Sequence, residues 1–169
     1  MKATIPVLMV LVAITFAQKP IPIPSLNLNK IQGLWYVVAA YPSYENVGID
    51  CFTMSFTLVS NDTINLALVQ EGNDNSLNST FNLDVINSGS VWIGPTGKAI
   101  AWISFDPING AWGTFASYGT GNAVILSRSP SLNFSIIASQ LALLQSEGYQ
   151  ANLTNTYFVP NNCTMGEFI

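Results

Sequence analysis

Large apolar side chains alternate with polar ones over much of the chain, with the period of two that is typical of β-strands. The clearest case is residues 51–58, where phenylalanine, methionine and leucine alternate with serine and threonine. Similar alternation, or a short run rich in β-branched and aromatic residues, recurs at residues 34–41, 64–68, 81–85, 91–93, 99–105, 111–118 and 123–126. The pattern therefore predicts eight short strands.

Turn-forming residues separate these runs, among them Asn61-Asp62, Gly94-Pro95 and Asn109-Gly110. Short strands at such regular spacing predict an antiparallel up-and-down meander in which every strand buries one face. Eight strands of this kind can close into a barrel with room for one small ligand. We therefore expect an all-β fold built on a single eight-stranded antiparallel barrel.

One segment departs from the period of two. From residue 134 to residue 144, Ile136, Ile137, Leu141 and Leu144 recur at helical spacing, and Glu147-Gly148 ends the run. This predicts one C-terminal amphipathic helix over residues 133–147, packed on the outside of the barrel. A last short strand is expected within residues 154–159.

The N-terminal residues predict the compartment. Lys2 is followed by an apolar run over residues 5–16, and Ala17 offers a signal-peptidase cleavage site. We interpret residues 1–17 as a signal peptide rather than a membrane anchor, because a spanning helix needs roughly 20 apolar residues. Residues 18–169 are then one secreted, extracellular domain with no transmembrane segment. Its first part, residues 18–29, is expected to be an extended leader, because every second residue from Pro20 to Pro24 lacks a backbone donor.

Charge is sparse. Only 8% of the residues are charged, with five basic and nine acidic side chains in the whole sequence. Because no basic cluster exists, nucleic acid and anionic membrane surfaces are poor candidate partners. With so few charged side chains, glycans could make the surface polar, and the chain has five glycosylation sequons. Glycans are expected among Asn61, Asn78, Asn133, Asn152 and Asn162.

The chain has two cysteines, Cys51 and Cys163. In an oxidising compartment the default is one disulfide between them, and the alternative is two free thiols. In the chain-entropy model, closing so long a loop stabilises the fold by up to about 4–5 kcal/mol.

Three motifs resemble the lipocalin family, and together they span residues 31–163. Gly33-Leu34-Trp35-Tyr36 is similar to the family's opening signature, and Arg128 stands where lipocalins carry an arginine that covers this tryptophan at the closed base. The sequence around Cys51 and Cys163 resembles the apolipoprotein D branch, which includes insect bilin-binding proteins and ties the second strand to the C-terminal tail. The resemblance implies structural roles for Gly33, Trp35 and Arg128.

The chain departs from the family pattern at two points. The family's middle motif of threonine, aspartate and tyrosine keeps only its aspartate, Asp106. The second disulfide that is common in the apolipoprotein D branch is missing, since there are no further cysteines. These departures bear on the ligand more than on the fold.

The residue inventory argues against most enzymes. The chain has no histidine, which excludes a Ser-His-Asp triad, a Cys-His pair and histidine-based zinc sites. The acidic residues mostly fall in predicted turns, where we interpret them as solvated rather than as a glycosidase pair. We expect no catalysis, no cofactor and no metal. One enzymatic alternative is an isomerase whose nucleophile is Cys51, reduced and pointing into the cup.

The resemblance implies that the barrel carries a small hydrophobic ligand of the lipid, pigment, retinoid or odorant class, entering near residues 47–50 or 72–76. Alternatively, the protein is a secreted structural or surface-active glycoprotein whose barrel is only a scaffold. The candidate lining is the large apolar face of the strands, and each member either lines a cavity or belongs to a packed core. These residues are Met54, Phe56, Leu66, Leu68, Phe81, Leu83, Trp102, Phe115 and Val124.

Overall fold

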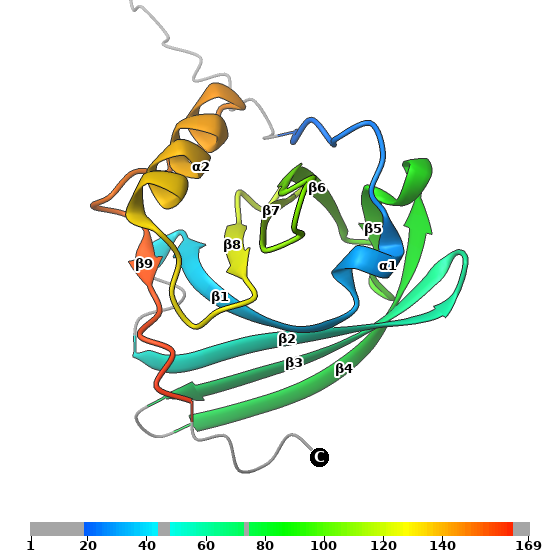
Figure 1. The fold of residues 1–169 in the computed structure, drawn as a ribbon, viewed down its shortest axis with the longest axis horizontal. Helices are drawn as coiled ribbons and strands as arrows, with labels where there is room; N and C mark the ends of the chain where they lie inside the picture. Colours follow the sequence, from blue (N-terminus) through cyan, green and yellow to red (C-terminus); the bar gives the residue numbers. More distant parts are fainter. Residues whose placement is uncertain (1–18, 44–47, 73–74, 164–169) are drawn as a thin grey trace, which may run out of the picture.

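The computed structural model describes residues 19–43, 48–72 and 75–163 (Figure 1). The signal peptide predicted for residues 1–17 lies outside these ranges. The elements in chain order are α1 (Leu28–Ile31), β1 (Gly33–Tyr41), β2 (Ile49–Ser60), β3 (Thr63–Gly72), β4 (Asn75–Ile86), the 3-10 turn η2 (Asn87–Gly89), β5 (Val91–Ile93), β6 (Ala99–Phe105), β7 (Trp112–Ser117), β8 (Ala123–Ser127), α2 (Phe134–Ser146) and β9 (Tyr157–Phe158).

The strands form a closed antiparallel barrel. Each of β2 to β7 pairs with the strand that follows it, β8 pairs with β1, and β1 pairs back onto β2. The predicted eight-stranded barrel is therefore confirmed, and β9 adds a ninth strand beside β1 (Figure 1). The end where β1 begins and β8 ends is called the closed end here, and the opposite end is called the mouth.

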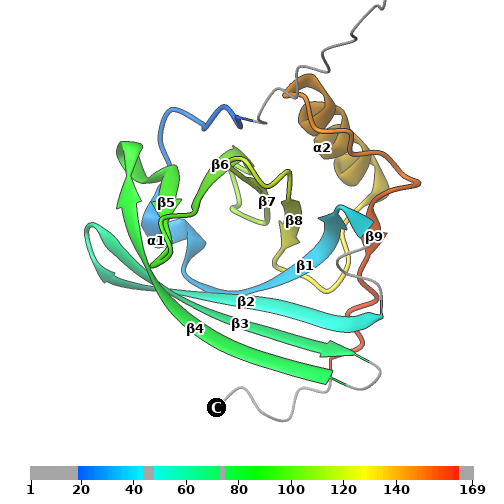
Figure 2. The same cartoon turned by 180° about the vertical axis from the view of Figure 1, so that it is seen from behind.

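Three strands are longer than the sequence pattern predicts. β2, β3 and β4 contain 12, 10 and 12 residues, and the β3–β4 ladder continues from Thr63 opposite Asp84 to Gly72 opposite Asn75. Their extensions carry asparagine, glutamine, glutamate and serine, which have a low strand propensity. The sequence therefore does not indicate a strand there, although the backbone hydrogen bonds of the ladder continue. Together these strands form the long, curved sheet at the base of Figure 2.

The leader crosses the outside of the barrel to the closed end. The amide of Ile23 donates to the carbonyl of Trp102 at 2.8 Å, and that of Leu26 donates to Ser88 at 3.0 Å. The extended segment ends earlier than predicted, because the side chain of Asn27 accepts from the amide of Asn29 and so starts α1.

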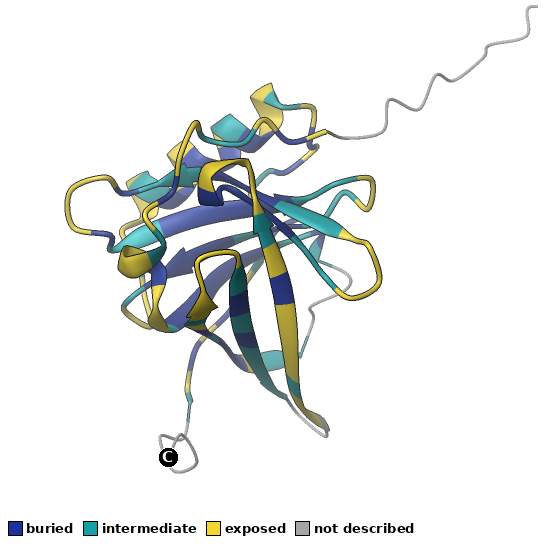
Figure 3. Cartoon of the chain, turned by 90° about the vertical axis from the view of Figure 1, so that its right-hand side faces the viewer, coloured by how far each residue is buried: buried dark blue, intermediate teal, exposed yellow. Residues whose placement is uncertain are grey.

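Two hydrophobic clusters hold the structure together. One lies inside the barrel, and the other lies between its outer wall and α2, as predicted for the helix. α2 buries Ile137, Leu141 and Leu144 against small side chains of β1, β6, β7 and β8. The predicted helix over 133–147 includes both capping residues, since the side chain of Asn133 accepts from the amide of Ser135. Figure 3 shows buried residues along many of the strands and exposed ones in the turns, and β4 is exposed over much of its length.

A disulfide joins Cys51 to Cys163, as expected from the pair of cysteines. It fastens the C-terminal segment to β2, where the amide of Asn162 also donates to the carbonyl of Asp50 at 3.0 Å. The segment continues the line of β9 along the barrel wall.

Candidate ligand-binding site

The strand register places the predicted lining residues on one concave face. In antiparallel ladders, residues directly opposite each other point to the same side of the sheet. The pairs are Met54 with Leu68, Phe56 with Leu66, Leu66 with Phe81, Ile64 with Leu83, Trp102 with Phe115, and Phe115 with Val124. All nine candidates therefore share the face that the barrel encloses, but they differ in what surrounds them.

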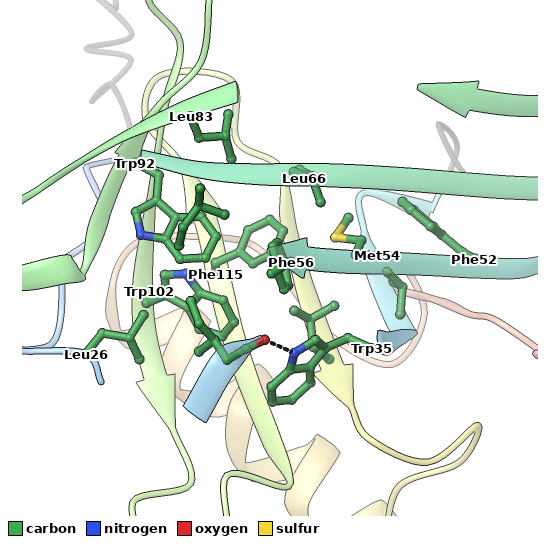
Figure 4. Close-up of a cluster of buried hydrophobic side chains, with 14 of the residues drawn as sticks. Leu26, Trp35, Phe52, Met54, Phe56, Leu66, Leu83, Trp92, Trp102 and Phe115 are labelled. Carbon is green, nitrogen blue, oxygen red and sulfur yellow. Dashed lines mark hydrogen bonds between the residues drawn. The ribbon is translucent and has the colours of Figure 1, made fainter. Parts of the chain in front are cut away.

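Aromatic side chains fill the closed half of the barrel. Trp102 is fully buried, and its ring lies 5.3 to 6.3 Å from five other aromatic rings (Figure 4). Those rings belong to Trp35, Phe56, Trp92, Phe105 and Phe115. We call this cluster the aromatic floor. Of the predicted lining residues, Phe56, Trp102 and Phe115 belong to this floor, and Phe115 also borders the cavity above it.

Hydrogen bonds to backbone carbonyls fix the orientation of two floor tryptophans. The indole N–H of Trp35 donates to Ile31 at 2.6 Å, and that of Trp92 donates to Gly89 at 2.7 Å. Both acceptors lie at the closed end, in α1 and η2. Each of these two bonds therefore holds its ring in one orientation, whereas the buried indole N–H of Trp102 has no hydrogen-bond partner among the described residues.

The three structural residues implied by the family resemblance lie together at the closed end. Arg128 covers Trp35, with its guanidinium carbon 3.8 Å from the ring centroid. Gly33 has a φ of +89°, and a Cβ there would lie 3.5 Å from Nη1 of Arg128. Burial lowers the pKa of the Arg128 guanidinium below its usual value.

Above the floor, near the mouth, lies a cavity of about 250 Å³. Its apolar wall includes Phe115 and Val124 from the predicted set, together with Ile100. Its rim comes from the β5–β6 and β7–β8 turns and carries Lys98, Thr120 and Asn122. An apolar base with a polar rim suits a ligand whose hydrophobic part is buried and whose polar end faces water.

The opposite wall of the cup consists of β2, β3 and β4. Met54 and Leu66 are buried there, and Leu68 is half-buried. Phe81 remains 39% exposed, although its partner Leu66 is buried. The reason is that β5 pairs with β4 only from Asp84 to Ile86, so no neighbouring strand covers Phe81 within the described ranges.

The sequence analysis missed several residues that shape the cup. Trp92 belongs to a three-residue strand, which is too short to show which face points inward. At Gly113, a Cβ would lie only 2.6 Å from Cζ3 of Trp102, so the ring packs directly on the backbone. A glycine inside a predicted strand is the one signal of such a close approach.

The disulfide removes the nucleophile that the isomerase alternative needs. Cys51 is bonded to Cys163, and along β2 it lies on the face opposite Phe52. Among the described residues, no cluster of three or more acidic or cysteine side chains is placed to hold a metal ion. In the same part of the chain, no helix is long and apolar enough to span a membrane.

No family model and no curated protein sequence matches this chain. Solved structures are similar in shape. Lipocalin 12 from rat epididymis has a TM-score of 0.69 at 16% identity, covering 89% of this chain and 94% of that one. The siderocalin Ex-FABP has a TM-score of 0.64 at 11% identity, with 80% and 97% covered.

Insecticyanin from the tobacco hornworm Manduca sexta also has a TM-score of 0.64, at 10% identity, with 85% of each chain covered. At these identities the similarity concerns the three-dimensional structure. The closed barrel, the outer helix and the neighbours lead to the same conclusion. This chain has the lipocalin fold.

Proposed function

We propose that this protein is a secreted lipocalin that binds a small hydrophobic ligand in the mouth half of its barrel. The observation that carries this proposal is the cavity of about 250 Å³ above the aromatic floor. Burial of apolar surface would drive binding, at about 25 cal/mol per Å² before the costs of association. Within the predicted lining, Phe115 and Val124 contact the ligand, while Phe56 and Trp102 support the floor beneath it.

The fold supports a carrier. Eight-stranded barrels of this type can hold one small ligand, and Ex-FABP, one of the similar structures, is described as functioning through dual ligand specificities. We extend the proposal to the ligand classes expected from the sequence: a lipid, pigment, retinoid or odorant. The link between β2 and the C-terminal segment favours the apolipoprotein D branch.

Secretion is proposed on the signal peptide predicted for residues 1–17 and on the disulfide, because disulfides persist in oxidising compartments. Four of the five sequon asparagines are exposed: Asn61, Asn78, Asn133 and Asn162. Asn152 is half-buried, and its amide nitrogen donates to the carbonyl of Gln150 at 3.3 Å. We therefore propose glycosylation first at the four exposed positions.

The scaffold alternative rests on a specific observation, since the aromatic floor already fills the closed half of the barrel. Native mass spectrometry of protein purified from its source, followed by organic extraction, separates the two functions. A single copurifying hydrophobic molecule that competitors displace supports the carrier. An empty protein that also fails to enhance the fluorescence of apolar probes contradicts the carrier and favours the scaffold.

A further inference from the structure

One long edge of the barrel wall has no strand beside it. β4 pairs with β3 from Asn75 to Asp84 but with β5 only at Asp84, Val85 and Ile86. β5 ends at Ile93 because the chain then turns, with the amide of Gly94 donating to the carbonyl of Lys98. Within the described ranges, no strand pairs with the outer edge of β4 from residue 75 to residue 83. We call these nine residues the free edge.

The free edge lacks the usual protection against pairing with another chain. Proteins protect exposed edges with charged side chains, prolines, bulges or a covering segment. The sequence of the free edge, Asn-Ser-Leu-Asn-Ser-Thr-Phe-Asn-Leu, has no charge and no proline, and its ladder with β3 has no bulge. On its concave side, Leu77 and Phe81 are 49% and 39% exposed. Regular, uncharged edges with exposed apolar side chains are association sites.

A glycosylation sequon lies within this edge. Asn78 begins the triplet Asn-Ser-Thr, is exposed, and stands opposite Val69 in the ladder. Because side chains alternate along a strand, Asn78 lies on the convex face, opposite to the face of Leu77. A glycan on Asn78 would therefore stand beside the free edge without entering the cup.

We propose that an N-linked glycan on Asn78 keeps the free edge from pairing with the free edge of a second copy of this chain. Without the glycan, two copies join their β4 strands about a two-fold axis, which uses both free edges and closes the assembly as a dimer. The pairing also covers the exposed Leu77 and Phe81. This inference rests on the secretion stated in the proposed function, since N-glycans are added in the secretory pathway.

The experiment uses the full chain secreted from a host that adds N-glycans. Glycopeptide mapping measures occupancy of Asn78, and size-exclusion chromatography with light scattering measures the polypeptide mass. Wild type is expected to be glycosylated at Asn78 and monomeric, whereas Asn78→Gln and Thr80→Ala, which both remove the sequon, should show about twice the polypeptide mass. Asn61→Gln removes a sequon in the β2–β3 turn and should stay monomeric.

Thr80→Lys is the matched counterpart of Thr80→Ala. It also removes the sequon, but it places a charge at an exposed position of the edge, so it should stay monomeric without a glycan. A wild type that is unoccupied at Asn78, or Asn78→Gln and Thr80→Ala variants that stay monomeric, would overturn the inference. A Thr80→Lys variant as dimeric as Thr80→Ala would overturn it too.

An apolar fluorescent probe titrated into the same samples keeps the two proposals apart. Probe binding by a wild type that fails the mass test contradicts only the role of the glycan. A wild type that binds no probe contradicts the carrier function, while the change in mass still tests the free edge.

Discussion

The guanidinium carbon of Arg128 lies over the ring of Trp35, 3.8 Å from its centroid, at the closed end of the barrel. The same group donates to the carbonyl of Leu34 at 2.7 Å and to those of Lys30 and Gln32 at 2.8 and 2.7 Å. One side chain at the end of β8 therefore holds α1 and the start of β1 in place. Because Trp35 belongs to the aromatic floor, this contact positions the base on which the cup stands.

Arg128→Ala should lower the free energy of unfolding by about 2–4 kcal/mol, because it removes three hydrogen bonds from a charged group and a cation–π contact. Affinity for an apolar probe should change little, since the cavity lies at the other end of the barrel. Urea unfolding and probe titration measure the two quantities. Arg128→Lys keeps the positive charge but lacks the planar guanidinium with its several N–H donors, so it should recover only part of the lost free energy of unfolding. Unchanged stability in Arg128→Ala would mean that the barrel base holds without this contact.

Gly113→Ala should destabilise the barrel by about 1–3 kcal/mol, the usual effect of overpacking. The added methyl would meet Cζ3 of Trp102 at 2.6 Å, and the ring has no space to retreat because five aromatic side chains surround it. Thermal unfolding and near-ultraviolet circular dichroism report the change. Gly94→Ala is the control, because its Cβ meets only ordinary contacts from 3.5 Å. Equal effects of the two substitutions would contradict the packing of Trp102 on Gly113.

Alternation along the chain was sufficient to predict the barrel, because each strand keeps one face inside and the period of two follows directly from that burial. It could not predict the lengths of β2, β3 and β4, whose polar ends are paired through the backbone. Nor could it show that Phe81 remains exposed. That exposure depends on where a different strand, β5, ends. Division of the interior into a floor and a cavity likewise depends on how six rings pack, and residue type alone does not determine such packing.

Replacing both Cys51 and Cys163 with serine should reduce stability by about 2–5 kcal/mol, since the disulfide closes a loop with a sequence separation of 112 residues. The barrel should still form, because its closure depends on strand pairing between β1 and β2 and between β1 and β8. Chemical unfolding with far-ultraviolet circular dichroism measures both effects. A double variant with wild-type stability would show that the link adds nothing beyond the contacts of the C-terminal segment.

The carboxylate of Asp106 should stabilise the fold at neutral pH, and this contribution to the free energy of unfolding should be lost in acid. Burial raises the pKa of its carboxyl group, but hydrogen bonds from the amides of Ala111, Ile108 and Asn109 outweigh burial and hold that pKa below its usual value. A depressed folded-state pKa gives stability that is present above the unfolded pKa of about 4 and is lost as pH falls through the folded value.

The test for Asp106 compares unfolding free energies of wild type and Asp106→Asn between neutral and strongly acid pH. The wild type should be more stable at neutral pH, because the variant turns an amide group toward the N–H of Ala111, and this advantage should shrink in acid. Asp84→Asn, at an exposed position on β4, is the control. If the difference in unfolding free energy between wild type and Asp106→Asn stays constant with pH, the charge of Asp106 does not stabilise the loop of residues 107–111.

A larger side chain on the cavity wall should fill the cavity and exclude the ligand. Val124 lines it, and an indole at this position would occupy a large part of its 250 Å³. Val124→Trp should therefore weaken binding of an apolar probe at least tenfold, which corresponds to about 1.4 kcal/mol, while unfolding shows a barrel that is still folded.

Val59→Trp makes the same change at a position that is 62% exposed and outside the cup, so its probe affinity should stay at the wild-type value. Two proteins with the same added indole then differ only in whether the cavity is open. If both bind the probe as wild type does, the ligand site lies elsewhere, and the concave wall of Leu77 and Phe81 becomes the next surface to test. If both lose binding, the added indole acts through general destabilisation, and the loss in Val124→Trp gives no support to the cavity.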